Sequence, residues 1–245
     1  MPEVVLEGDG PVATITLNAP ERRNALTLEM ADAFVAALAR VGENRDVAAL
    51  VVQARGESFC AGADYKVLSA AAADPAEAES FEMISRIYDS FFLLGQVGVP
   101  TIAAARGSCV GAGLNLLLAT DLRIVARDTR LLSGFAPRGL HPGGGHLHLL
   151  ARVAGRETTA AMALFGQEID GERAARVGMA WEAVDAADVE SRAHAIASSL
   201  AANPALSRRL VRTFREETES LRTSWQVAKE LERPSQMWSM RNPPG

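Results

Sequence analysis

The chain has 245 residues, of which 48% are hydrophobic, 22% are charged and 5% are aromatic. These proportions are typical of a globular protein and exclude collagen-like, low-complexity and intrinsically disordered chains. The formal net charge of −5 gives no excess of basic surface for nucleic acid or for an anionic membrane, so we expect neither as a partner.

The cysteine content and the apolar stretches bear on where the protein works. Two cysteines, Cys60 and Cys109, cannot supply a disulfide framework, which predicts a cytoplasmic protein. The first ten residues have neither a basic start nor an apolar run, so we expect no signal peptide. The longest apolar stretch, residues 114–119, is interrupted by Asn115 and is too short to span a bilayer.

The N-terminal quarter of the chain predicts a hairpin, a helix and a buried strand. Residues 4–7 and 12–17 have strand character and flank the turn residues Gly8, Asp9 and Gly10. Residues 27–41 carry an apolar stripe at helical spacing and begin with a threonine, a favoured N-cap residue. Residues 48–54 are continuously apolar apart from one glutamine, as in a strand that is buried on both faces.

Strands and helices continue to alternate up to about residue 126, and the remainder is mainly helical. Residues 70–78 are rich in Ala and Asp, and we expect them to be mobile. Helical spacing follows over 81–91, then a strand over 101–105, a helix over 111–119 and a strand over 122–126. The later predicted helices are residues 147–154, 157–164, 172–177, 188–201, 204–219 and 221–238. This order predicts βαβ units that are capped by C-terminal helices.

Two segments of small residues, Gly56 to Asp64 and Ala105 to Asn115, each follow a predicted strand. Small residues let another group approach the backbone closely, and the second segment opens into a helix whose first N–H groups have no helical partner. Two such N–H groups directed at one point would stabilise an oxyanion. Alone, each segment is more often a sign of tight packing, and the second lacks the spacing of a dinucleotide fingerprint or a P-loop.

Taken in order, several motifs resemble those of the enoyl-CoA hydratase/isomerase (crotonase) superfamily. They are Asn18 to Leu26, Phe59 to Asp64, Pro100 to Arg123, Gly139 to Gly145 and Gly171 to Gly178, and the resemblance covers about residues 4–235. It implies an α/β fold, namely a spiral of ββα turns with two roughly perpendicular sheets and C-terminal helices. It also implies a spiral core in residues 1–200 and a helical segment in residues 201–245 that covers the pocket and forms a homotrimer or a dimer of trimers.

The resemblance further implies an acyl-CoA ligand, with no other cofactor and no metal. By motif position, the backbone N–H groups of Ala63 and Ala112 would hold the thioester carbonyl oxygen as an oxyanion hole. One preorganised donor of this kind is typically worth roughly 10²–10³ in rate. The same alignment gives further substrate-binding positions: Ala61, Asp64, Tyr65, Lys66, Gly111 and Phe135, with Arg23 reaching the phosphates.

The chain departs from the family where hydratases carry two glutamates. The corresponding positions are Asn115 and Phe135, and neither side chain can abstract a proton. No Asp or Glu occurs from Thr129 to Gly155, so a small shift of the alignment does not restore the second acid.

Other acid–base groups in the sequence are few. His141, His146 and His148 lie beside the glycine-rich turn, and His141, with a reference pKa of about 6.5, is the candidate acid or base. The alternative is that these are loop or helix-surface histidines. Cys60 and Cys109 are either buried small residues or thiol nucleophiles.

Three functions therefore stay open from the sequence. The first is an enoyl-CoA hydratase/isomerase-like lyase or isomerase that stabilises a thioester enolate. The second is a decarboxylase of malonyl-type thioesters, which needs an oxyanion hole and a dry pocket but no strong base. The third is a protein that binds acyl-CoA without catalysis.

Overall fold

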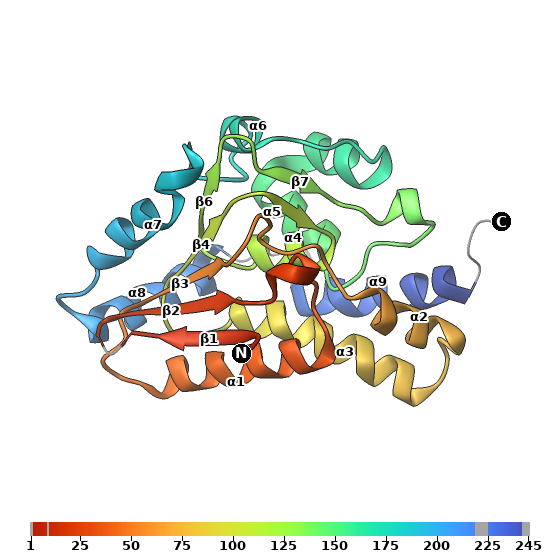
Figure 1. Ribbon diagram of the computed structural model, residues 1–245, viewed down its shortest axis with the longest axis horizontal. Helices are drawn as coiled ribbons and strands as arrows, with labels where there is room; N and C mark the ends of the chain where they lie inside the picture. The colour runs from red at the N-terminus through yellow and green to blue at the C-terminus, as the bar shows by residue number, and fades with distance from the viewer. Residues whose placement is uncertain (1, 9, 219–224, 242–245) are drawn as a thin grey trace.

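A six-stranded sheet runs through the protein in the order β1-β2-β3-β4-β6-β8 (Figure 1). The computed structural model describes residues 2–8, 10–218 and 225–241. The strands are β1 (Val4–Glu7), β2 (Val12–Leu17), β3 (Ala49–Ala54), β4 (Thr101–Ala105), β6 (Leu122–Ala126) and β8 (Glu182–Val184). β1 and β2 form the predicted antiparallel hairpin, and the later neighbours pair in parallel. Asp9, in the predicted turn, lies outside the described residues.

Both faces of the sheet are covered, which explains the continuous apolar run of β3. Leu50 and Val52 point into the larger core, whereas Ala49 and Val51 point into a smaller core beneath α7 (Val189–Ser198). Successive side chains of a strand point to opposite faces, so a strand between two helical layers must be apolar at every position.

A second, two-stranded parallel sheet is formed by β5 (Ser108–Val110) and β7 (Arg130–Leu132). The sequence pattern did not predict these strands individually, because three residues are too few to show a period of two. The same is true of β8. Two sheets are nevertheless what the family resemblance implies.

Helices account for most of the rest of the described chain. They are α1 (Leu28–Glu43), α2 (Tyr65–Ala73), α3 (Ala78–Leu94), α4 (Ala112–Leu118), α5 (His146–Thr159), α6 (Gly171–Arg176), α7, α8 (Pro204–Thr218) and α9 (Trp225–Arg241). Thr27 caps α1 as predicted, with its side chain accepting a hydrogen bond from the N–H of Met30. We expect mobility over residues 70–78, but residues 70–73 are the last turn of α2, because alanine has the highest helix propensity.

The C-terminal helices lie on different parts of the core. α9 contacts α2 and α5, and Figure 1 shows it beside α2. Trp225, at its start, is buried, and its ring centroid lies 6.4 Å from that of Phe91 and 5.1 Å from that of Phe92. On α8, Leu210 and Phe214 remain about half exposed in the single chain. The end of the predicted 204–219 helix, the start of the predicted 221–238 helix and the side chain of Trp238 lie outside what is described, and the two-segment division stays a prediction.

Among the described helices, none combines the length and the apolar character that crossing a membrane requires.

Candidate active site

The two glycine-rich segments lie side by side in the structure. Cys60 and Cys109 form a parallel bridge, in which the N–H of Cys60 donates to Ser108 O at 3.1 Å and the N–H of Val110 donates to Cys60 O at 3.0 Å. The two segments thereby form one wall of a cavity of about 290 Å³, which we call the central cavity. Its lining residues are Ala61, Gly62, Ala63, Tyr65, Leu68, Ile84, Ile87, Tyr88, Phe91, Val110, Gly111, Ala112, Asn115, Gly134, Phe135, Arg138, Leu140, Gly143 and Gln236.

Two backbone amides in this wall have no acceptor among the described residues. Leu26 pairs on either side of Ala63, because its N–H donates to Gly62 O at 2.8 Å and its carbonyl accepts from the N–H of Asp64 at 2.9 Å. This pairing leaves the N–H of Ala63 unused, and Ala112 is the first residue of α4. Neither amide donates a hydrogen bond to any part of the chain that the structure describes, so both can donate to a ligand.

Glycine at two positions allows the segments to come this close. A Cβ added to Gly62, whose φ is +104°, would lie 2.8 Å from Val110 O and 3.8 Å from the backbone nitrogen of Ala112. A Cβ added to Gly113 would lie 2.3 Å from Cys60 O. Any side chain at either position would push the two segments apart, and with them the amides of Ala63 and Ala112.

The first segment is held from behind by Asn24, which is buried. Its Oδ1 accepts a hydrogen bond from the N–H of Ala19 at 2.8 Å, and its Nδ2 donates to Arg55 O at 2.9 Å and to Ser58 O at 2.8 Å. The sequence motif that contains Asn24 pointed to the family, but its role in anchoring the loop appears only in the structure.

Asn115 lines the central cavity and belongs to a buried network that extends behind its wall. It is 1% exposed, its Nδ2 donates to Gly143 O at 3.1 Å, and its Oδ1 lies 2.7 Å from Nδ1 of His146. Nε2 of His146 is hydrogen-bonded to the hydroxyl of Ser133. Burial lowers the pKa of His146 to about 3, so the imidazole is neutral at physiological pH. The ring of Phe135 lies edge-on to that of His146, with 5.0 Å between the centroids.

One of the three histidines departs from the expected loop or helix-surface position. His146 is fully buried, so that expectation is wrong for it. His141 is partly buried, its Nδ1 lies 2.6 Å from Pro142 O, and it is not among the residues that line the central cavity. No periodic signal marked His146, because its partners come from segments 13 and 31 residues away.

The remaining predicted residues divide into wall, rim and surface. Ala61, Gly111 and Phe135 line the cavity, and Tyr65 lines its mouth while remaining 81% exposed. Asp64 caps α2 by accepting from the N–H of Lys66 at 2.8 Å. Lys66 and Arg23 are exposed and lie outside the wall.

Three polar residues of the wall, Tyr88, Arg138 and Gln236, were missed by sequence reasoning. The hydroxyl of Tyr88, on α3, is hydrogen-bonded to Oε1 of Gln236, on α9. Burial raises the pKa of the Tyr88 phenol, which keeps it protonated. The Arg233 guanidinium lies 4.8 Å from the centroid of the Tyr88 ring. At helical spacing, Tyr88 is indistinguishable from an ordinary core aromatic residue.

Glu232 also joins α9 to the site. Its carboxylate accepts hydrogen bonds from the N–H groups of Gly145, His146 and Leu147 at 2.9, 3.0 and 3.1 Å, which caps the start of α5. Burial raises the pKa of Glu232 to about 7 despite these three donors.

Acid–base groups are scarce in the cavity wall. Its described residues include no Asp, Glu, His or Lys, and the titratable groups are Tyr65, Tyr88 and Arg138. The thiols do not add a nucleophile, because burial raises the pKa of Cys60 to about 12 and that of Cys109 well above its usual range. The wall therefore provides hydrogen-bond donors and apolar surface, but no group suited to activating water.

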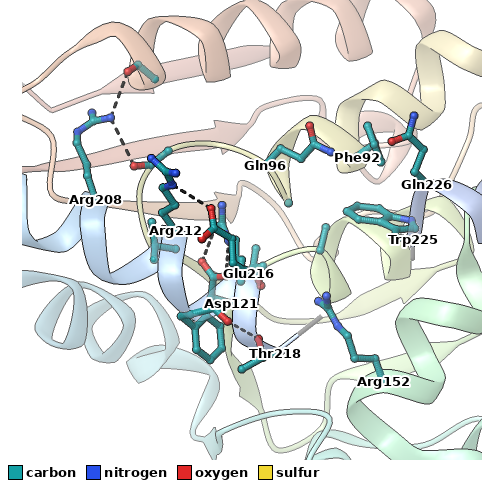
Figure 2. Close-up of a pocket in the computed structure, with 18 of the residues that line it drawn as sticks. Phe92, Gln96, Asp121, Arg152, Arg208, Arg212, Glu216, Thr218, Trp225 and Gln226 are labelled. Carbon is teal, nitrogen blue, oxygen red and sulfur yellow. Dashed lines mark hydrogen bonds and ion pairs between the residues drawn. The ribbon is translucent and has the colours of Figure 1, made fainter. Parts of the chain in front are cut away.

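A larger cavity of about 1030 Å³ lies beside α8 and is lined by several arginines (Figure 2). Several of its guanidinium groups have structural partners: Arg208 donates to Val41 O and Gly42 O at the end of α1, and Arg212 pairs with Glu216. Arg215 makes an ion pair with Asp121 at 2.7 Å. Figure 2 shows Arg208 and Arg212 on one side and Arg152 on the other, so these side chains do not converge on one point.

Comparisons with known proteins agree with this geometry. The family model "Enoyl-CoA hydratase/isomerase" matches residues 7–239. The chain belongs to the enoyl-CoA hydratase/isomerase family. The resemblance noted in the sequence is thereby confirmed, and the protein is an acyl-CoA enzyme of the hydratase/isomerase type.

Two curated members of the enoyl-CoA hydratase/isomerase family cover most of the chain. "Probable enoyl-CoA hydratase EchA14" of Mycobacterium tuberculosis (strain ATCC 25618 / H37Rv) is 43% identical over 201 residues, which is 82% of this chain and 76% of that protein. The "1,2-epoxyphenylacetyl-CoA isomerase" of Escherichia coli (strain K12) is 32% identical over 225 residues, 91% of this chain and 86% of that protein.

Solved structures of the enoyl-CoA hydratase/isomerase family have the same fold. An enoyl-CoA hydratase/isomerase from Xanthobacter autotrophicus Py2 superposes with a TM-score of 0.88 at 27% identity, covering 98% of this chain and 88% of that one. An enoyl-CoA hydratase from Bacillus halodurans superposes with a TM-score of 0.86 at 21% identity, covering 98% and 95%. The expected crotonase fold, with two sheets and C-terminal helices, is confirmed.

Proposed function

We propose that this enzyme is an acyl-CoA isomerase or lyase that forms a thioester enolate in the central cavity. The backbone N–H groups of Ala63 and Ala112 hold the thioester carbonyl oxygen and take up the negative charge that develops on it. The observation that carries this proposal is the pair of amides, for which the described part of the chain supplies no acceptor and whose residues line the same small cavity. Donors that are already in place require no reorganisation when the charge appears.

Hydration through carboxylate-activated water is not the reaction that this wall favours. Asn115 and Phe135 occupy the two positions where the family's hydratases carry glutamates, and the described wall offers no other carboxylate. An amide cannot abstract a proton from water, and the Phe135 ring excludes water rather than positioning it. The wall supports reactions that need the enolate but no strong base.

Isomerisation within the acyl group also passes through the enolate, but it needs a group that takes a proton from the acyl chain, and the described wall offers no carboxylate or imidazole for that step. The E. coli relative, which is 32% identical over 91% of this chain, is named as an isomerase of an acyl-CoA.

Decarboxylation of a malonyl-type thioester is the second candidate, and the acid-free wall favours it. The electrons of the breaking bond between Cα and the carboxylate carbon enter the enolate, and carbon dioxide leaves. The enolate carbon then takes one proton, for which the Tyr88 phenol, protonated and buried in the wall, is the available internal donor.

A panel of thioesters tests these reactions in one experiment. Loss of 2-enoyl absorbance reports hydration of crotonyl-CoA, a gain in that absorbance from a 3-enoyl-CoA reports isomerisation, and labelled carbon dioxide reports decarboxylation. Turnover in the second or third assay without the first is the expected result. Hydration as the main activity would contradict the proposal, and tight binding without any turnover would indicate an acyl-CoA carrier.

The oxyanion hole has its own test in Ala112→Pro. Ala112 is the first residue of α4, where a helix tolerates proline, so the substitution removes one N–H with little disturbance of the fold. We expect kcat/KM for the active thioester to fall by roughly 10²–10³. Ala112→Ser keeps the N–H and serves as the matched control. Equal activity of the proline variant and the control would show that this amide does not hold the substrate oxygen.

A further inference from the structure

We propose that Arg138 binds a carboxylate on the acyl group, and that the enzyme therefore acts on CoA thioesters of short dicarboxylic acids. This inference rests on the proposed function, because it takes the thioester carbonyl oxygen to lie at the N–H groups of Ala63 and Ala112. It adds the class of acyl group that the central cavity would select.

The charge of the cavity wall is the first observation. Arg138 is the only cation among the described residues that line the central cavity, and the same residues include no Asp or Glu. Within the described ranges of the chain, Arg138 forms no ion pair. A cleft that carries one sign of charge attracts a ligand of the opposite sign. The wall therefore favours an acyl group that is itself anionic.

The guanidinium group of Arg138 is anchored at one of its nitrogens. Its Nη1 donates to Gly134 O at 2.7 Å, and the backbone N–H of Arg138 donates to Phe135 O at 2.8 Å, within a short 3₁₀ turn over Ala136–Arg138. Gly139, with a φ of +69°, ends this turn. A guanidinium carries five N–H groups, and Gly134 O takes one of them. The others can bind both oxygens of a carboxylate.

Gly134 places this guanidinium beside the segment that leads into Ala112. A Cβ added to Gly134 would lie 3.2 Å from Nη1 of Arg138 and 3.8 Å from the backbone nitrogen of Gly111. Nη1 is thus within about 7 Å of that nitrogen, and the nitrogen of Ala112 follows one residue later, at most about 3.8 Å away. A short acyl group whose thioester oxygen lies at Ala112 can therefore place a terminal carboxylate at Arg138.

The same position argues against a phosphate of CoA as the anion. The pantetheine arm, with its two amide groups, lies between the thioester sulfur and the nearest phosphate. The phosphates are therefore many bonds farther from the oxyanion hole than a carboxylate on a short acyl chain. Carboxylate and phosphate share the chemistry that a guanidinium recognises, and the two sources are separated by experiment.

Matched pairs of thioesters isolate the effect of the carboxylate charge. Isovaleryl-CoA has the shape of malonyl-CoA, with two methyl groups in place of the carboxylate oxygens, and 5-methylhexanoyl-CoA matches glutaryl-CoA in the same way. Dissociation constants are measured by calorimetry, and kcat/KM is measured for any thioester that turns over. We expect the wild-type protein to bind at least one acid about tenfold more tightly than its methyl counterpart, the effect of a charged hydrogen-bonded contact.

Variants of Arg138 test the residue itself. Arg138→Gln is neutral, and we expect it to lower the acid-to-methyl affinity ratio about tenfold while changing the affinity for the methyl members less than about twofold. Arg138→Lys keeps the charge but loses the two-pronged geometry, so the ratio should fall about threefold. Arg156→Gln is the matched control, because Arg156 is an exposed arginine of α5 outside the cavity wall. It changes the net charge equally and should leave the ratio unaltered.

Three results overturn the inference while leaving the proposed function intact. In the first, the wild-type protein binds neither acid more tightly than its methyl counterpart. In the second, the preference for the acid persists in Arg138→Gln. In the third, Arg138→Gln weakens both members of each pair equally, which would show that Arg138 binds a phosphate of CoA. Failure of the proposed function looks different, because no thioester would then bind better than CoA itself and Ala112→Pro would not weaken its binding.

Discussion

Glu232→Gln is expected to gain stability relative to the wild type as the pH rises through neutrality. Glu232 is a buried carboxylate on α9 whose oxygens accept hydrogen bonds from three N–H groups at the start of α5. Burial raises its pKa to about 7, so the folded protein holds a proton that the unfolded chain has already released. Glutamine is of the same size and cannot ionise, and it keeps one of the two acceptor oxygens. The lost acceptor is a cost that does not vary with pH, so the change of the difference with pH reports the ionisation alone.

The sign and size of the effect follow from this pKa. The group takes up its proton more readily in the folded state, so its stabilising contribution is complete below the unfolded pKa and is lost as the pH rises to about 7. The raised pKa of Glu232 corresponds to roughly 3 kcal/mol across that window. The free energy of unfolding of Glu232→Gln minus that of the wild type should therefore rise by roughly this amount between about pH 4 and pH 8.

Urea denaturation, monitored by far-UV circular dichroism and repeated across this pH range, measures this difference in the free energy of unfolding. Glu230→Gln is the matched control on the same helix. Glu230 is paired with Arg233, which lowers the pKa of Glu230, so the control should show the opposite sign. A difference that stays flat or falls with pH for Glu232→Gln would refute the reasoning, since it would mean that the three N–H donors outweigh desolvation.

Three further predictions concern other parts of the molecule. Burial lowers the pKa of His146 to about 3, so the wild type should lose stability relative to His146→Gln as the pH falls from about 6.5 to about 3, by on the order of 4 kcal/mol in acid denaturation curves. Gly113→Ala should lower stability by about 1–3 kcal/mol in thermal melting, because its Cβ would meet Cys60 O at 2.3 Å, whereas Gly42→Ala, with open space around it, should not be destabilising. We propose that the protein forms a homotrimer or a dimer of trimers. Phe214→Asp, on the exposed face of α8, should then shift the molecular mass measured by light scattering toward that of the monomer. An unchanged mass would place the subunit interface elsewhere.

Local sequence patterns were reliable where a segment is long enough to show its period. The hairpin of β1 and β2, the strand β4, and the helices α1 and α3 follow from apolar spacing and capping residues alone. β5, β7 and β8 did not, because each has three residues and is held by pairing with distant strands. The resemblance singled out Ala63 and Ala112, and the structure brings both into the wall of one cavity, because their segments keep the small residues that close backbone contact demands. Their role as an oxyanion hole stays a prediction.

The sequence by itself determined the fold family and the acyl-CoA ligand class, and it predicts Asn115 and Phe135 at the two positions where hydratases carry glutamates. Those features depend on residue types at fixed spacing along the chain. Only the tertiary structure decided that Asn115 is held by His146 and Ser133, that Tyr88 meets Gln236, and that Glu232 caps α5. Each of these contacts joins segments far apart in the chain, and burial then sets the protonation state of the groups involved, which no local pattern encodes.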